Sequence, residues 1–226
     1  MARDHMSDGN RLWRVVPGPC EINPRVDNVS DVPRPPADPS RPATPARLLD
    51  AAESAFAASG YAAARLEDIA GGAGIQRASL LHHFGSKEAL YAEVVRRSFD
   101  ALGTALAAAT ARPGSFEPRL KAVVETFARF VDARPSLARI ILREMVATEG
   151  PGRAILLDQV APLLSRVEAF VRRDGRGLIP RGLPVRAALL DTATSLLVRA
   201  ASGDLRGPLW GGRTSSWAVA RHLFTA

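Results

Sequence analysis

A short run of hydrogen-bonding side chains between residues 76 and 83 is the part of this sequence best equipped to contact another molecule. The polar side chains expected to face solvent there are Gln76, Arg77, Ser79, His82 and His83. An arginine can donate two hydrogen bonds to one guanine, and the other side chains can reach base edges and phosphates. The composition of this run therefore predicts a nucleic-acid contact.

Two short helices are expected to position these side chains. Apolar residues of the first helix follow the i, i+3, i+4, i+7 spacing, at Leu66, Ile69, Ala70 and Ala73. Gly74 follows, and glycine readily adopts the left-handed conformation that ends a helix. The second helix is expected over 76–83, with Leu80 and Phe84 on its apolar side. Two short helices joined by a turn that contains glycine form a helix-turn-helix, and the small side chain of Ala70 lets them pack closely.

The wider stretch from Ala46 to Val95 resembles the amino-terminal DNA-binding domain of the TetR family of transcriptional regulators. The matching motifs are Leu48 to Ala52 (LLDAA), Phe56, Gly60-Tyr61, Asp68-Ile69-Ala70, Ala73-Gly74-Ile75 and His83 to Glu88 (HFGSKE). The resemblance implies that bases are contacted by Arg77, Ala78 and Ser79. It implies contacts to phosphates or nearby bases by His82, His83 and Lys87. Gln76, on the exposed face of the second helix, and Arg65, through its charge, are further candidate DNA contacts.

Three departures from the family pattern bear on DNA affinity. Arg65 stands near the place of a capping Thr or Ser, so it supplies charge but no cap. Leu81 replaces a tyrosine that would contact a phosphate. Gly71-Gly72 costs helix stability, at roughly 1 kcal/mol for each glycine relative to alanine.

The remaining sequence predicts an all-α fold of about nine helices. Ala, Leu and Arg are plentiful, and apolar residues recur at helical spacing between Pro- and Gly-containing turns. We expect a Pro-rich disordered tail over 1–44, a helix-turn-helix domain over 45–91, and a helical regulatory and dimerisation domain over 92–226. The tail is either a partner- or DNA-contacting arm or an inert extension.

Family resemblance also predicts a ligand cavity and a homodimer. The candidate ligand-contacting residues in the helical domain are Phe127, Ile141, Glu144, Met145, Leu163 and Asp191. For Arg143-Glu144 the alternative is a structural ion pair or an interhelix hydrogen bond, and Asp191 could equally face a symmetry mate. The dimer would form through the last two helices, where small residues such as Ala187 and Ala201 permit close approach.

Composition excludes several other classes of protein. No run of 18 apolar residues suggests a membrane helix, and the single cysteine, Cys20, cannot form an internal disulfide, so a cytoplasmic protein is expected. Phosphate-loop, GxSxG and HExxH motifs are missing, which argues against an enzyme or a cofactor. Adjacent histidines on a helix point about 100° apart, so His82 and His83 predict no metal site. The net charge of +7 lies in residues 101–226 and does not itself indicate DNA binding.

These observations favour a ligand-responsive repressor that binds a palindromic DNA operator as a dimer and is released by a small hydrophobic effector. Two alternatives stay open. The first is a TetR-like ligand- or protein-binding module with lost or weakened sequence-specific DNA binding, motivated by Arg65, Leu81 and the paired glycines. The second is an enzyme on a helical scaffold.

Overall fold

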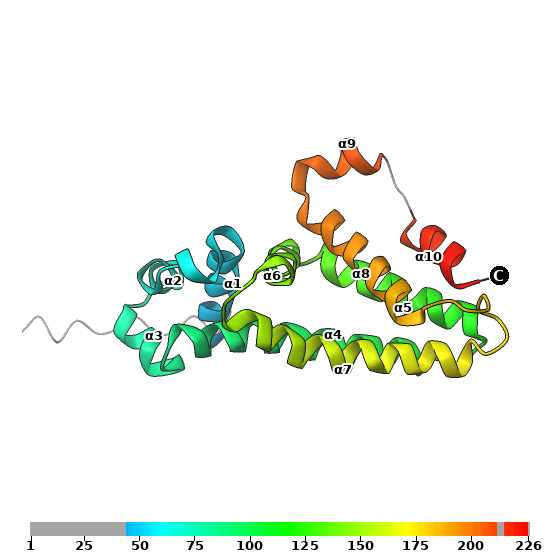
Figure 1. Ribbon diagram of the computed structural model, residues 1–226. Helices are drawn as coiled ribbons and strands as arrows, with labels where there is room; N and C mark the ends of the chain where they lie inside the picture. Colours follow the sequence, from blue (N-terminus) through cyan, green and yellow to red (C-terminus); the bar gives the residue numbers. More distant parts are fainter. Residues whose placement is uncertain (1–43, 212–214, 226) are drawn as a thin grey trace, which may run out of the picture. The chain divides into compact units, whose positions relative to one another are not determined.

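Helices make up the regular structure of the protein in a computed structural model that describes residues 44–211 and 215–225 (Figure 1). No strand occurs in those two ranges, which agrees with the expected all-α class. The elements are α1 (Thr44–Ala63), α2 (Leu66–Gly72), α3 (Arg77–Phe84), α4 (Lys87–Thr110), α5 (Phe116–Asp132), α6 (Pro135–Val146), α7 (Pro151–Asp174), α8 (Val185–Ala201), the 3₁₀ turn η1 (Gly203–Leu205), α9 (Arg206–Trp210) and α10 (Ser216–Phe224). The expected tail, with Cys20, lies outside the described residues apart from Thr44.

The helix-turn-helix is formed by α2 and α3, as the apolar spacing predicts. Ile69 and Ala70 of α2 and Leu80 of α3 are buried between these helices and their neighbours. Gly74 turns the chain with φ of 71°. The guanidinium of Arg47, on α1, donates a hydrogen bond to the carbonyl oxygen of Ala73, so the long helix behind the pair also fixes the turn.

Helix α1 is broken at Gly60, where φ is 79° and ψ is 169°, and then continues to Ala63. A positive φ is adopted at low cost by glycine, which explains why the break falls at this residue. An aromatic cluster anchors this end of α1. The rings of Phe56 and Tyr91 pack edge to face with centroids 4.8 Å apart, and Tyr61 and Tyr91 do the same at 5.2 Å.

The long helices α4 and α7 lie side by side, and α5 and α8 pack above them (Figure 1). Their apolar stripes join the core of the helix-turn-helix in one continuous hydrophobic cluster. Helices α1 and α6 also contact each other. The domain boundary expected near residue 91 falls inside the continuous α4 and stays a prediction.

Two features of the helical domain go beyond the expected helices. Helix α7 begins at Pro151, because proline fits the first turn of a helix, where its missing N–H is not needed. The segment between α8 and the last helix contains η1 and α9, which the pattern of apolar residues did not reveal. None of the described helices is long and apolar enough to cross a membrane.

Candidate DNA-binding surface and interior cavity

Helix α3 presents its polar residues to solvent on one continuous surface. Leu80 is fully buried and holds the helix against the domain. The surrounding predicted contact residues are all exposed: Gln76, Arg77, Ala78, Ser79, His82 and His83. Because α3 begins at Arg77, the three residues predicted to face bases occupy its first turn, which is the part of a recognition helix that reaches base edges.

The arginines of this surface are held by an acidic residue that the sequence analysis did not single out. Glu67 of α2 forms an ion pair with Arg77, with Nε and Oε1 3.3 Å apart, and its other oxygen lies 3.9 Å from Nε of Arg65. All three side chains are at least half exposed, so these ion pairs contribute little stability and can be exchanged for contacts to phosphate. Glu67 therefore orients Arg77 while leaving it available.

Lys87 takes a different position from the one expected. Its ammonium donates a 3.0 Å hydrogen bond to the carbonyl oxygen of Ala62 and lies 4.9 Å from the centroid of the Tyr61 ring. These contacts join the start of α4 to the end of α1. In this structure Lys87 supports the domain, and its contact with phosphate remains a prediction.

The starts of α2 and α4 differ in their capping. Arg65 precedes α2 and makes no side-chain cap, whereas Ser86 caps α4 by accepting a 3.0 Å hydrogen bond from the backbone of Ala89. The rings of His82 and His83 have centroids 6.0 Å apart. Over the parts of the chain that the structure describes, no group of three His, Cys, Asp or Glu side chains could hold a metal ion.

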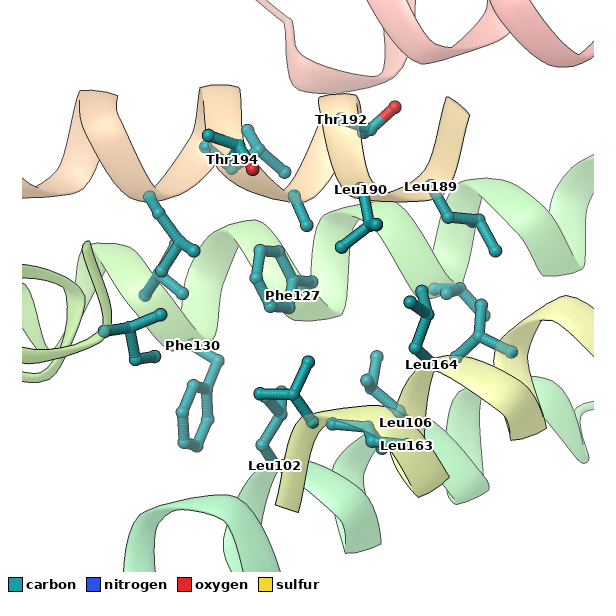
Figure 2. A pocket seen from close by; sticks show the side chains of 18 of the residues that line it. Leu102, Leu106, Phe127, Phe130, Leu163, Leu164, Leu189, Leu190, Thr192 and Thr194 are labelled. Atoms are coloured by element: carbon teal, nitrogen blue, oxygen red, sulfur yellow. The ribbon is translucent and has the colours of Figure 1, made fainter. Parts of the chain in front are cut away.

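An apolar cavity of about 300 Å³ lies among α4, α5, α6, α7 and α8 (Figure 2). Four of the six predicted ligand-contacting residues line it: Phe127, Ile141, Met145 and Leu163. Figure 2 shows the Phe127 ring between α8 and the leucines of α4 and α7. The hydroxyl of Thr192, in the wall, donates a 2.8 Å hydrogen bond to the carbonyl oxygen of Ala188. The cavity is therefore suited to a hydrocarbon group.

The other two predicted ligand residues do not line this cavity. Asp191 is exposed on α8, because the helix turns it away from the core. Glu144 is buried, and its carboxylate accepts a 2.7 Å hydrogen bond from the Tyr91 hydroxyl on α4. Burial and this hydrogen bond raise the pKa of Tyr91 well above its usual range, which keeps the hydroxyl a donor. Glu144 thus makes the interhelix hydrogen bond that was the alternative to ligand contact.

Helix α6 lines the cavity and also contacts α1 and α4, the two helices that flank the helix-turn-helix. Ile141 and Met145 lie in the cavity wall, while Glu144 bonds to α4. The guanidinium of Arg143 lies directly against Gly60, where a Cβ atom would overlap it. A shift of α6 would alter contacts with both α1 and α4.

The sequence that forms α2 and α3 matches a known protein family. Residues 48–94 match the family described as "Bacterial regulatory proteins, tetR family". Residues 48–94 of the chain form a tetR-family domain. The matched residues include all of α2 and α3, so these two helices are the helix-turn-helix of a tetR-family domain. The tetR family comprises regulators rather than enzymes, in agreement with the sequence analysis.

The curated relatives of this chain include both an activator and a repressor of transcription. It is 35% identical over 103 residues to the transcriptional activator FasR of Mycolicibacterium smegmatis, covering 46% of this chain and 47% of FasR. It is 36% identical over 120 residues to the transcriptional repressor KstR2 of Rhodococcus jostii, covering 51% of this chain and 59% of KstR2. The chain thus aligns with about half the length of these curated relatives.

A solved structure extends the likeness to the helical domain at the level of fold. FadR from Bacillus subtilis, crystallised with stearoyl-CoA, is 16% identical and superposes with a TM-score of 0.63. The superposition covers 79% of this chain and 94% of FadR. The fold of the whole described chain is therefore that of tetR-family regulators.

Proposed function

We propose that the protein is a transcriptional regulator that binds double-stranded DNA through α3 and releases it when a hydrophobic ligand occupies the cavity. The observation that carries the proposal is the exposed first turn of α3, with Arg77, Ala78 and Ser79 on a helix fixed by buried Leu80. Such a regulator would act in the cytoplasm, where the sequence analysis places it. We expect that DNA binding represses transcription.

The proposed DNA contacts fall into two chemical classes, those to bases and those to phosphates. Arg77 would leave Glu67 and donate to a guanine, while Ser79 and Gln76 would contact bases or sugar-phosphate less selectively. Arg65, His82 and His83 surround the same surface and would contact phosphates, which fix the register of the helix without reading sequence. Lys87 would join them only by leaving its bond to α1.

The proposed homodimer would form through α8 and α10, which correspond to the last two helices expected from the sequence. Apolar side chains are exposed on both helices, with Val198 38%, Val219 56% and Leu223 37% exposed. Ala187, also exposed on α8, would permit close approach. A two-fold dimer places two copies of α3 on one side, so the operator would be palindromic with half-sites about one helical turn apart.

The proposed effector is a small molecule with a long or bulky hydrocarbon part. The cavity lining favours this class, and FadR, whose structure holds stearoyl-CoA, shares the fold. An occupant would press on Ile141 and Met145 in α6. Since α6 also contacts Gly60 and Tyr91, the resulting shift would change the spacing of the two α3 helices in the dimer.

Selection from a pool of random DNA duplexes tests the proposal. The wild-type protein should enrich a palindrome, and Arg77→Ala should not. Arg186→Ala, an exposed arginine on α8, serves as the matched control and should enrich the same palindrome. Adding palmitoyl-CoA or palmitate should then release the DNA.

Failure of the wild-type protein to enrich any sequence, although it is folded and binds the lipid, would favour the binding-module alternative. Two observations support this alternative. Arg65 provides no side-chain cap for α2, and Arg77 is paired with Glu67.

A further inference from the structure

The end of the helical domain that lies farthest from α3 carries an excess of arginine. The α4–α5 turn and the α7–α8 loop meet there (Figure 1). Arg119 of α5 joins them, since it donates hydrogen bonds to the carbonyl oxygen of Thr110 and to the carboxylate of Asp174. Helix α4 begins beside α3 and runs for 24 residues to this end, so about 36 Å separate the two. This distance exceeds the roughly 10 Å over which salt screens exposed charges, so the end acts independently of α3.

The charge on this end is strongly positive. Neither the α4–α5 turn (111–115) nor the α7–α8 loop (175–184) contains a carboxylate. Asp174, just before the loop, is already shared by Arg119 and Arg173, and Glu117 pairs with Arg221 of α10. Three further arginines are exposed and, in the part of the chain that the structure describes, make neither an ion pair nor a side-chain hydrogen bond: Arg112, Arg176 and Arg181. These three charges are therefore available to an anionic partner.

An exposed leucine lies in the same loop, between two of these arginines in the sequence. The side chain of Leu178 is 54% exposed. The loop that carries it is compact, because the backbone N–H groups of Leu178 and Ile179 both donate to the carbonyl oxygen of Gly175. The side chains of Ile179 and Phe116 lie directly against Gly175 and fix the loop on α5. Leu178 is thus presented to solvent by a loop that is held in place.

Unpaired arginines around an exposed leucine fit a lipid surface better than a nucleic acid. Basic residues near an anionic bilayer are attracted to its phosphates, and an apolar side chain gains by entering the boundary with the acyl chains. A DNA duplex would use the arginines but offers little apolar surface to Leu178. A single strand would stack its bases on exposed aromatic rings, whereas Phe116 and Phe170, the rings beside this loop, are buried.

We propose that this end of the helical domain docks on an anionic lipid bilayer. The contact surface, called the distal patch, consists of Arg112, Arg173, Arg176, Leu178 and Arg181. The arginines contact lipid phosphates, and Leu178 enters the interface. Docking does not depend on DNA binding. It brings the apolar cavity to a bilayer, which is where a hydrocarbon ligand accumulates.

Sedimentation of the full chain with lipid vesicles tests the proposal. The probes are vesicles of phosphatidylcholine and phosphatidylglycerol in equal parts, and vesicles of phosphatidylcholine alone. The protein should bind the anionic vesicles at least ~10-fold more tightly, since each basic residue near the surface adds to the attraction. The binding should weaken as salt rises.

Matched variants locate the contact on the distal patch. Arg176→Gln combined with Arg181→Gln removes two exposed charges and should weaken binding to anionic vesicles at least ~10-fold. Leu178→Ser should weaken it about 5-fold, because one partly inserted leucine is lost. Arg129→Gln combined with Arg153→Gln removes two exposed arginines outside the patch and should bind vesicles as the wild type does.

Arg77→Ala separates this proposal from the proposed DNA binding. It should bind anionic vesicles as the wild type does, and the double patch variant should enrich the same palindrome as the wild type. All these positions are exposed, so each variant should keep the wild-type melting temperature.

Three results would overturn the proposal. The first is equal binding to anionic and to neutral vesicles, or binding to neither. The second is equal affinity for anionic vesicles in the wild type and the double patch variant. The third is a patch that serves nucleic acid: in the Arg77→Ala background, the two patch substitutions would then weaken binding to a random duplex but not to vesicles.

Discussion

At the scale of single residues, the neighbours Arg143 and Glu144 show how one helix serves two purposes. They do not pair with each other, since Arg143 lies against Gly60 of α1 and Glu144 accepts a hydrogen bond from Tyr91 of α4. Both contacts join α6, which lines the cavity, to the helices that flank the helix-turn-helix. The Tyr91–Glu144 bond is the buried polar contact on which this connection depends.

Removing the Tyr91 hydroxyl should therefore destabilise the protein. Tyr91→Phe leaves the buried Glu144 carboxylate without this donor, which should lower the free energy of unfolding by about 1–3 kcal/mol. Urea unfolding followed by circular dichroism measures the change. Glu144→Gln, whose amide oxygen can still accept the bond, should lose less, and an unchanged midpoint in Tyr91→Phe would contradict a structural role for this bond.

Sequence reasoning could identify some of these residues and not others. The α3 surface follows from local spacing, because Leu80 and Phe84 fix which side of a short helix is buried. The role of Glu144 depends on Tyr91, 53 positions away, and only the packing of α4 against α6 brings them together. Arg199 lies on the apolar stripe of α8 beside Leu196 and Ala200, and its helical spacing was the signal that could have marked it as buried.

At the scale of elements, the packing of α2 on α3 sets the geometry of the DNA-binding surface. Ala70 is 1% exposed, so a larger side chain there would separate the two helices. The sequence predicted these helices well, because their apolar spacing and the glycine between them are local features. It missed α9, which is only five residues long and has no buried stripe.

Enlarging Ala70 tests this packing. Ala70→Leu should lower the free energy of unfolding by about 1–3 kcal/mol through overpacking, and should weaken DNA binding. Ala78→Leu adds the same volume at an exposed position of α3, so it should leave thermal stability unchanged while altering the proposed base contact. Equal melting temperatures for Ala70→Leu and the wild type would contradict close packing of α2 on α3.

The far end of the helical domain contains an acid-sensitive contact between α5 and α7. Hydrogen bonds from Arg173 and then Arg119 hold the pKa of Asp174 below its usual range. A depressed carboxylate pKa stabilises the fold above the unfolded value of about 3.9, and this contribution is lost as pH falls through the folded value.

Asp174→Asn should therefore be less stable than the wild type at neutral pH, and the difference should shrink below about pH 4. Urea unfolding of both proteins across a pH series measures it. A difference that stays constant with pH would show that the ion pairs are not its source.

At the scale of the whole molecule, helix α6 connects the domain that carries the candidate DNA-binding surface to the apolar cavity. The tetR-family match covers the helices of the first. The second is lined by side chains from six helices, including Phe224 of α10, which the sequence alone could not assemble. Four of the candidate ligand-contacting residues, Phe127, Ile141, Met145 and Leu163, line the cavity as expected. The sequence could not show that Asp191 turns outward, since polar residues on a helix leave both orientations open.

The measurement that tests the central claim most directly is the affinity of wild type and Arg77→Ala for the selected palindrome and for a scrambled duplex, over a salt series. The wild type should prefer the palindrome at least ~10³-fold, with binding that weakens steeply as salt rises. Arg77→Ala should lose most of this preference, since each bidentate contact to guanine discriminates by about 1–3 kcal/mol and a dimer makes two. A wild-type protein that binds both duplexes alike, or an Arg77→Ala variant that keeps the full preference, would contradict the assignment of α3 as the DNA-reading helix.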